Sequence, residues 1–224
     1  VLDSVQQTAT EAGVHVITGD TKVVGRGHAD GMYITTSGIG AVADGIRLHP
    51  DQVRPGDQIM ISGTIADHGL AVMLAREMPD VKSGLRSDVA PLNGLIAALL
   101  AGVQGVVFMR DPTRGGLAAV AADLAERTAL HVELDETAIP ICPETTQAAE
   151  LLGLDPLEVA NEGKVVVVVR PEAAHAALEA LRSHPLGREA RVIGKVTETT
   201  DAICELLTEI GGRSGMQKPY GEQL

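Results

Sequence analysis

Five consecutive valines, Val165–Val169, restrict the folds open to this chain more than any other part of its sequence. A short run of apolar, β-branched residues is typical of a buried strand, and it is far too short to cross a membrane. Other short apolar runs alternate along the chain with apolar residues at helical spacing. Strands that alternate with helices predict a layered α/β fold.

The pattern along the chain predicts eight strands and six helices. The expected strands are residues 14–18, 32–37, 58–62, 105–109, 131–134, 164–169, 191–197 and 202–207, the last two as a closing pair. The expected helices lie around residues 2–12, 67–74, 92–100, 116–125, 144–152 and 171–181. Asp67 is the expected N-cap of the second helix, and the glycine-rich tail from Gly211 is expected to be irregular.

Two domains are expected from this order of elements. Residues 1–50 would be the remnant of an amino-terminal domain. Residues 51–224 would form a complete carboxy-terminal α/β domain with a mixed sheet.

The charge balance limits the partners. Eighteen basic and thirty acidic residues give a net charge of −12, a field that repels DNA, RNA and anionic membranes. A nucleotide site in such a chain needs local Lys or Arg, Mg²⁺ or helix N-termini. Two cysteines without a CxxC motif favour a cytoplasmic protein over a disulfide framework. No two histidines have the spacing of zinc ligands.

The first segment with chemical potential is Gly19, Asp20, Thr21 and Lys22, after an expected strand. Ligands in α/β proteins commonly bind where strands end. Asp20 can hold Mg²⁺ through its oxygens, and Lys22 can contact phosphate. A solvated turn is the alternative interpretation.

The second segment, residues 110–116, opens an expected helix. Paired glycines allow a ligand close to the backbone, and a helix N-terminus attracts phosphate. An ordinary helix cap with solvent-facing arginines is the alternative. The residues that this prediction assigns to the nucleotide are Asp111, Thr113, Arg114, Gly115 and Gly116.

The third segment is Asn161-Glu162-Gly163-Lys164, directly before the valines. A carboxylate beside a buried strand can serve as a base. From the sequence alone, an exposed turn glutamate is the favoured interpretation.

Together with Asp67-His68-Gly69 and His184-Pro185-Leu186-Gly187, these three segments resemble the HypE family of hydrogenase maturation factors. That family belongs to the aminoimidazole ribonucleotide synthetase superfamily. The resemblance implies homodimers of two α/β domains with ATP and Mg²⁺ bound between the domains. It makes residues 1–50 the remnant of the ATP-binding, dimerising domain. It also implies HypF and the HypC–HypD scaffold as partners.

The implied reaction is an ATP-dependent dehydration. HypF loads a carbamoyl group onto a terminal cysteine, ATP phosphorylates the carboxamide oxygen, and loss of phosphate leaves a thiocyanate. Carried over by resemblance, Asp20 would bind Mg²⁺–ATP and Lys22 would contact phosphate or the carbamoyl group. Glu162 would remove an amide proton, and the 110–116 segment would shape the phosphate side.

Two departures from the family pattern lead to a further expectation. Family members begin well upstream of Val1 and end in Pro-Arg-Ile-Cys, whereas this sequence stops at Leu224. We therefore expect this polypeptide to be catalytically incomplete and to bind ATP weakly or not at all.

Three alternatives remain open at the level of sequence. Selenophosphate synthetase and thiamine-monophosphate kinase belong to the same superfamily and use ATP. A non-catalytic fragment that only binds a maturation partner is the third.

Overall fold

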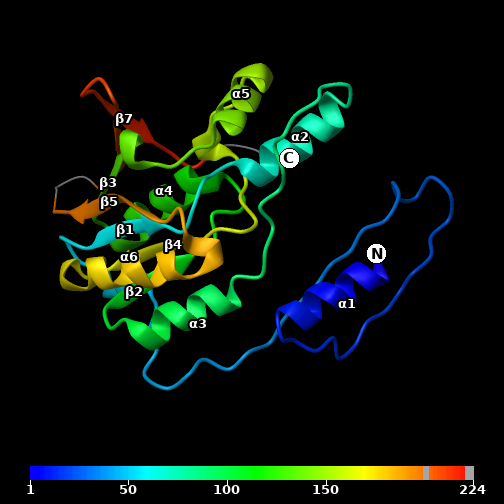
Figure 1. Cartoon of the computed structure of the whole chain (residues 1–224), viewed down its shortest axis with the longest axis horizontal. Coiled ribbons are helices and arrows are strands. Elements are labelled where there is room, and N and C mark those ends of the chain that lie inside the picture. The colour runs from blue at the N-terminus through cyan, green and yellow to red at the C-terminus, as the bar shows by residue number, and fades with distance from the viewer. Residues whose placement is uncertain (199–201, 220–224) are drawn as a thin grey trace. The chain divides into compact units, whose positions relative to one another are not determined.

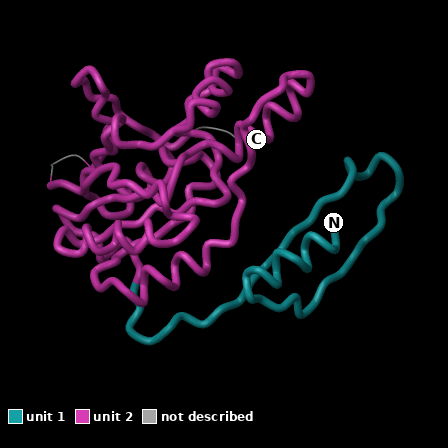
Figure 2. Tube along the Cα trace, viewed as in Figure 1, with its two compact units in different colours: residues 1–47 teal, residues 48–224 magenta. Residues whose placement is uncertain are grey.

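The computed structural model describes residues 1–198 and 202–219. The chain divides into two compact units, Val1–Arg47 and Leu48–Leu224 (Figure 2). The ATP-binding and dimerising roles expected of residues 1–50 stay predictions.

The first unit contains one helix, α1 (Leu2–Glu11), followed by extended chain. The strands expected at 14–18 and 32–37 are wrong, since every residue from 12 to 47 is described and none lies in a strand. A strand requires the N–H and C=O groups of a neighbour, which an apolar sequence does not itself supply. Large apolar side chains of these segments are exposed, Ile17 by 87% and Ile34 by 58%.

The second unit is built on a seven-stranded sheet in the order β2-β4-β1-β5-β3-β6-β7 (Figure 1). Its strands are β1 (Gln58–Ile61), β2 (Val106–Arg110), β3 (His131–Asp135), β4 (Val166–Val169), β5 (Arg191–Thr197), β6 (Cys204–Leu207) and β7 (Arg213–Met216). The neighbouring strands β3 and β6 are parallel, and the other neighbours are antiparallel. This mixed sheet confirms the predicted fold class.

Five α-helices and five short 3₁₀ turns connect these strands in the described residues of this unit. The helices are α2 (Asp67–Glu77), α3 (Asn93–Gly102), α4 (Gly116–Thr128), α5 (Pro143–Leu152) and α6 (Ala174–Ser183). The 3₁₀ turns are η1 (Pro50–Gln52), η2 (Glu136–Ala138), η3 (Pro156–Glu158), η4 (Pro171–Ala173) and η5 (Pro185–Gly187).

The valine run explains how the layers form. Along β4, Val166 and Val168 point into a core shared with α4. Val165, Val167 and Val169 alternate with them and point into a second core with α3 and α6. Because successive side chains of a strand face opposite sides, a strand covered on both faces must be apolar at every position.

Two expectations for the carboxy-terminal part are wrong. The tail is not irregular throughout, since β7 pairs with β6. The strands β5 and β6 do not pair with each other either, because β3 lies between them. Within the described residues, no helix is long and apolar enough to cross a membrane.

Candidate functional site

Two of the three predicted segments meet where the ends of three neighbouring strands lie together. Strand β4 runs antiparallel to both β1 and β2, and its first residue, Val166, lies opposite Ile61 and Arg110. The carboxy-terminal ends of β1 and β2 therefore lie beside the amino-terminal end of β4. Residues 62–67, 110–116 and 161–165 are collected there, although they are far apart in the sequence.

The opening of α4 depends on its two glycines. Gly115 and Gly116 have φ values of 70° and 61°, which favour glycine. A Cβ on Gly116 would lie 2.5 Å from the carbonyl oxygen of Leu157 and 2.6 Å from that of Val159. Gly115 is the N-cap and offers no side-chain cap to the helix. The Gly116 N–H donates to the Thr113 carbonyl oxygen at 3.0 Å, so the positive dipole end of α4 is the feature that suits an anion here.

The polar side chains of this segment differ in exposure. Asp111 and Arg114 are exposed, and Thr113 is half-buried. Arg110 forms an ion pair with Asp123 on α4, so the structure gives this guanidinium a partner within the protein.

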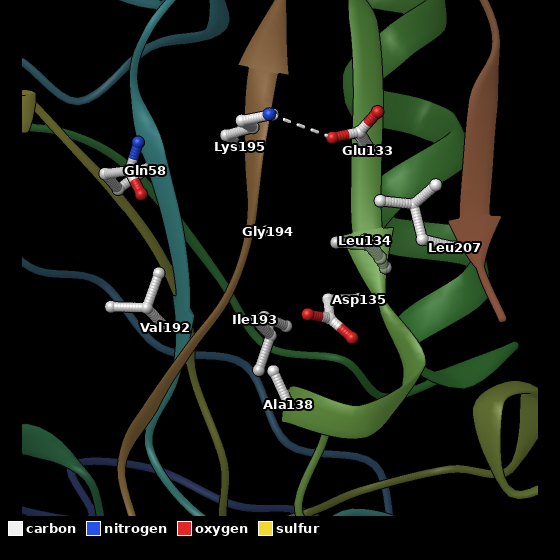
Figure 3. Close-up of a pocket in the computed structure, with 10 residues that line it drawn as sticks. All are labelled: Gln58, Glu133, Leu134, Asp135, Ala138, Val192, Ile193, Gly194, Lys195 and Leu207. Atoms are coloured by element: carbon white, nitrogen blue, oxygen red, sulfur yellow. Dashed lines mark ion pairs between the residues drawn. The ribbon is translucent and has the colours of Figure 1, made fainter. Parts of the chain in front are cut away.

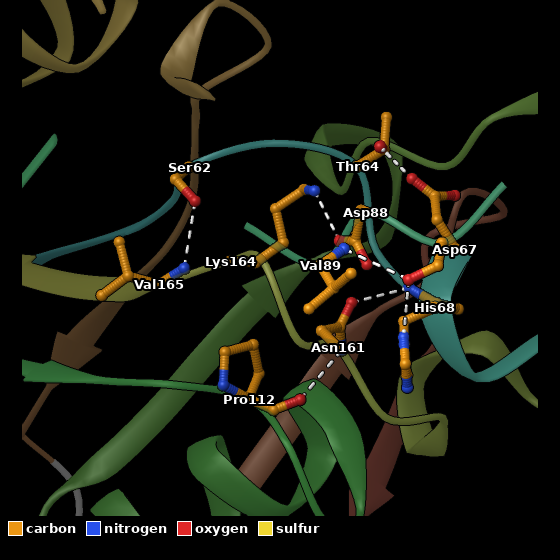
Figure 4. Close-up of polar contacts among 12 residues, drawn as sticks. Ser62, Thr64, Asp67, His68, Asp88, Val89, Pro112, Asn161, Lys164 and Val165 are labelled. Carbon is orange, nitrogen blue, oxygen red and sulfur yellow. Dashed lines mark hydrogen bonds and ion pairs between the residues drawn. The ribbon is translucent and has the colours of Figure 1, made fainter. Parts of the chain in front are cut away.

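Glu162 is exposed, as the sequence favoured, but its neighbour Asn161 is fully buried. The Asn161 side chain accepts a hydrogen bond from the Ala66 N–H at 2.7 Å. It also donates to the carbonyl oxygen of Pro112 at 3.0 Å (Figure 4). A second bond runs from the same side-chain nitrogen to the carbonyl oxygen of Val159, also at 3.0 Å. One amide thus joins the loop after β1, the 110–116 segment and the residues before Glu162.

A buried ion pair follows on the other side of Glu162. The Lys164 ammonium lies 2.5 Å from Oδ2 of Asp88, and the two side chains are only 11% and 10% exposed. The second carboxylate oxygen of Asp88 is buried without a hydrogen-bond partner. The sequence did not single out Asp88, because it lies in a polar loop 76 positions away from its partner.

The expected N-cap at Asp67 is wrong. Ala66 is the N-cap of α2, with φ of 68°, and Asp67 is the first helical residue. The Asp67 carboxylate, 6% exposed, accepts hydrogen bonds from the hydroxyls of Thr64 and Thr145, both at 2.5 Å. The side chain therefore ties α2 to α5 instead of capping its own helix.

Gly19, Asp20, Thr21 and Lys22 belong to the first unit, where all four are exposed in extended chain. One oxygen of Asp20 accepts a hydrogen bond from the Thr21 N–H at 2.8 Å. The roles of these residues stay predictions.

The two cysteine thiols are poorly suited to nucleophilic chemistry. Burial raises the pKa of Cys204 to about 12. Burial also raises the pKa of the half-buried Cys142, and Asp67 and Glu144 add to the effect against a hydrogen bond with Thr64. Both thiols are therefore protonated at neutral pH.

A shallow cavity of about 260 Å³ lies elsewhere on the sheet, between β3 and β5 (Figure 3). Its charged pair, Lys195 and Glu133, is closed on itself at 3.1 Å. None of the predicted site residues lines this cavity. In the described part of the chain, no three His, Cys, Asp or Glu side chains gather as metal ligands.

Comparisons with known proteins agree with the resemblance. Residues 54–206 match the family model of the AIR synthase related protein, C-terminal domain. The whole chain is 49% identical to the carbamoyl dehydratase HypE of Rhizobium leguminosarum bv. viciae, of which it spans 64%. The chain thus covers less than two thirds of the length of this curated relative.

Solved structures of HypE proteins also match this chain. The crystal structure of Escherichia coli HypE matches all of this chain, with a TM-score of 0.89 and 37% identity, over 71% of its own length. A HypE in complex with ATP matches 98% of the chain at a TM-score of 0.88 and 34% identity, over 68% of its length. A HypE–HypF complex matches 97% of the chain at a TM-score of 0.87 and 37% identity, over 71% of the HypE chain.

A thiamine-monophosphate kinase from Aquifex aeolicus matches 75% of the chain at a TM-score of 0.52 and 19% identity, which shows the fold alone. The relatives with higher identity, the domain match and the solved structures agree, and this chain belongs to the HypE family of hydrogenase maturation proteins.

Proposed function

We propose that the complete protein is an ATP-dependent carbamoyl dehydratase, of which this chain carries the base and part of the phosphate side. It would convert an enzyme-bound S-carboxamide to a thiocyanate, the source of the cyanide ligand of [NiFe]-hydrogenases. The observation that carries the proposal is that the Glu162 segment and the opening of α4 meet at the same strand ends. Asn161 joins the two segments by its hydrogen bond to Pro112. A dehydration through a phosphorylated oxygen needs a base and a phosphate site close together.

Glu162 is the proposed base. Its carboxylate is exposed, while the residues on both sides of it are buried. An accessible acceptor on a fixed main chain suits removal of an amide proton from a group brought in by another segment.

The opening of α4 is the proposed phosphate side. Gly115 lies at the positive dipole end of α4, a helix of 13 residues, and the N–H of the buried Gly116 already donates to the Thr113 carbonyl oxygen at 3.0 Å. The exposed Arg114 adds a charge that pairs with phosphate oxygens, and Thr113 and Asp111 line the approach. Such donors stabilise the charge that develops as phosphate leaves.

Residues 19–22 would serve the nucleotide. Asp20 is a single exposed carboxylate, and one carboxylate suits only a Mg²⁺ that arrives with the phosphates of ATP. Bound Mg²⁺ would neutralise phosphate charge, with Asp20 as a ligand. Lys22 would contact phosphate or polarise the carbamoyl oxygen.

The proposed partners are HypF, the HypC–HypD pair and a second copy of the protein, in the cytoplasm. A known HypE–HypF complex supports the first of these.

The test follows the mass of the complete gene product during incubation with HypF, carbamoyl phosphate and ATP. We expect the wild-type protein to gain a carbamoyl group and then lose one water. Glu162→Gln should accept the carbamoyl group and then lose water about 100- to 10,000-fold more slowly than the wild type. Glu172→Gln, at an exposed glutamate of η4, is the matched control and should behave as the wild type does. Loss of water from Glu162→Gln at the wild-type rate would refute the proposal.

A partner-binding module without chemistry is the second candidate, and the similarity to a HypE–HypF complex supports it. A pull-down with HypF beside an ATPase assay separates the two functions. Binding without ATP turnover by the complete gene product would favour the module.

A further inference from the structure

Glu162 lies between two buried anchors. On one side, Asn161 is 0% exposed, and both its main chain and its side chain bond to the carbonyl oxygen of Pro112, at 3.1 and 3.0 Å. On the other side, a Cβ on Gly163 would lie 1.8 Å from the carbonyl oxygen of Asp88. The chain at this point is therefore pressed between the 110–116 segment and the loop of Asp88.

The second anchor continues into β4. Lys164 pairs with Asp88 at 2.5 Å, and the Val165 N–H donates to the Ser62 hydroxyl at 3.0 Å (Figure 4). Of residues 161–165, only the Glu162 side chain is exposed. The exposure of the carboxylate is thus combined with a main chain that cannot shift freely.

The hydrogen bonds made by the side chain at position 161 can all be formed only by asparagine. Its oxygen receives the N–H of Ala66, a residue held at φ of 68°, and its nitrogen serves the carbonyl oxygens of Pro112 and Val159. This arrangement needs one acceptor and two donors on one short planar group. Aspartate has the acceptor without the donors, and glutamine is longer by one methylene.

We propose that Asn161 is a positioning residue, which couples the opening of α4 to Glu162 and so fixes the distance between phosphate site and base. The inference rests on the proposed function. A displacement of about 1 Å between reacting groups can lower a rate about 100-fold, so an anchor shared by both sides affects the chemistry directly.

A purely structural role for Asn161 predicts a different behaviour. Loss of buried hydrogen bonds would then lower thermal stability and scale turnover by the same factor, whether or not the base is present. A positioning role requires that the effect on turnover depends on Glu162.

The experiment is a double-mutant cycle in the complete gene product. We compare the wild type, Asn161→Asp, Glu162→Gln and the double variant, with Asn161→Ala as a second substitution should the aspartate variant fail to fold. The measurements are the single-turnover rate of water loss from the carbamoylated protein and the unfolding temperature. Thr145→Val is the control, because it removes a buried hydrogen bond of the same unit that does not involve residues 161–165.

We expect Asn161→Asp to lower the rate about 10- to 100-fold in the wild-type background and to change it less than about twofold beside Glu162→Gln. Thr145→Val should lower only the unfolding temperature. An equal factor in both backgrounds, or no loss of rate in the Asn161 variants, overturns the positioning role. A Glu162→Gln variant as fast as the wild type would instead refute the proposed function itself.

Discussion

The ion pair of Lys164 and Asp88 gives a prediction with a large magnitude. Lys164→Met keeps the aliphatic stem and removes the charge. The Asp88 carboxylate would stay behind with 10% exposure and with one oxygen that already lacks a hydrogen bond. Loss of one partner of a buried pair costs about 3–5 kcal/mol, because a buried charge is left without compensation.

The assay is thermal unfolding, followed by circular dichroism. For a protein of this size, about 1 kcal/mol lowers the melting temperature by about 2–4 °C, so the variant should melt about 6–20 °C lower. Lys195→Met is the matched control. Lys195 is 51% exposed and lies 3.1 Å from Glu133, so its removal should cost less than about 1 kcal/mol.

The double variant Asp88→Asn with Lys164→Met checks the cause. It removes both charges and should be more stable than Lys164→Met alone, because no charge is left buried. Equal losses for Lys164→Met and Lys195→Met, or a double variant no more stable than Lys164→Met, would refute the reasoning.

Three more predictions follow from the second unit. Gly163→Ala should greatly reduce the yield of folded protein on expression, since its Cβ meets the Asp88 carbonyl at 1.8 Å. Burial alone would raise the pKa values of Asp123 and Glu133, but the cations paired with them outweigh it and hold both values below the usual range. The stability from these carboxylates is therefore present above their unfolded pKa values and is lost as the pH falls below about 4. In measurements of the free energy of unfolding at decreasing pH, Asp123→Asn should therefore lose less stability than the wild type does. Lys218→Ala should speed proteolysis of the carboxy-terminal tail, because Lys218 holds it on α4 through ion pairs with Asp123, at 2.9 Å, and Glu126; an unchanged cleavage rate would contradict this role.

Sequence patterns were sufficient for most elements of the second unit, with β7 as an exception. The valines of β4 and the apolar stripe of α3 are local signals, and both elements formed where expected. The strand β7 was missed because Arg213–Met216 contains a glycine and no buried residue, so its pairing with β6 leaves no apolar alternation. In the first unit, β-prone residues such as Val16 have no strand beside them in the structure.

The candidate site was predictable only in part. Glycines at a helix opening and a glutamate before a buried strand are visible in one sequence. The contacts that join them are not, because Asn161 reaches Ala66 across 95 positions and Pro112 across 49. Nothing local distinguishes a buried bridging asparagine from an asparagine of an exposed turn.

The strand order also determines when this domain can form during synthesis. Strand β1 is central, yet its neighbours β4 and β5 are translated more than one hundred residues later. At about 5–20 residues per second, the nascent chain presents the unpaired edges of β1 for roughly 5–20 s. Until β4 emerges, the apolar strand Ile59–Ile61 has neither sheet neighbour, so a ribosome-associated chaperone that covers this segment should raise the yield of folded protein.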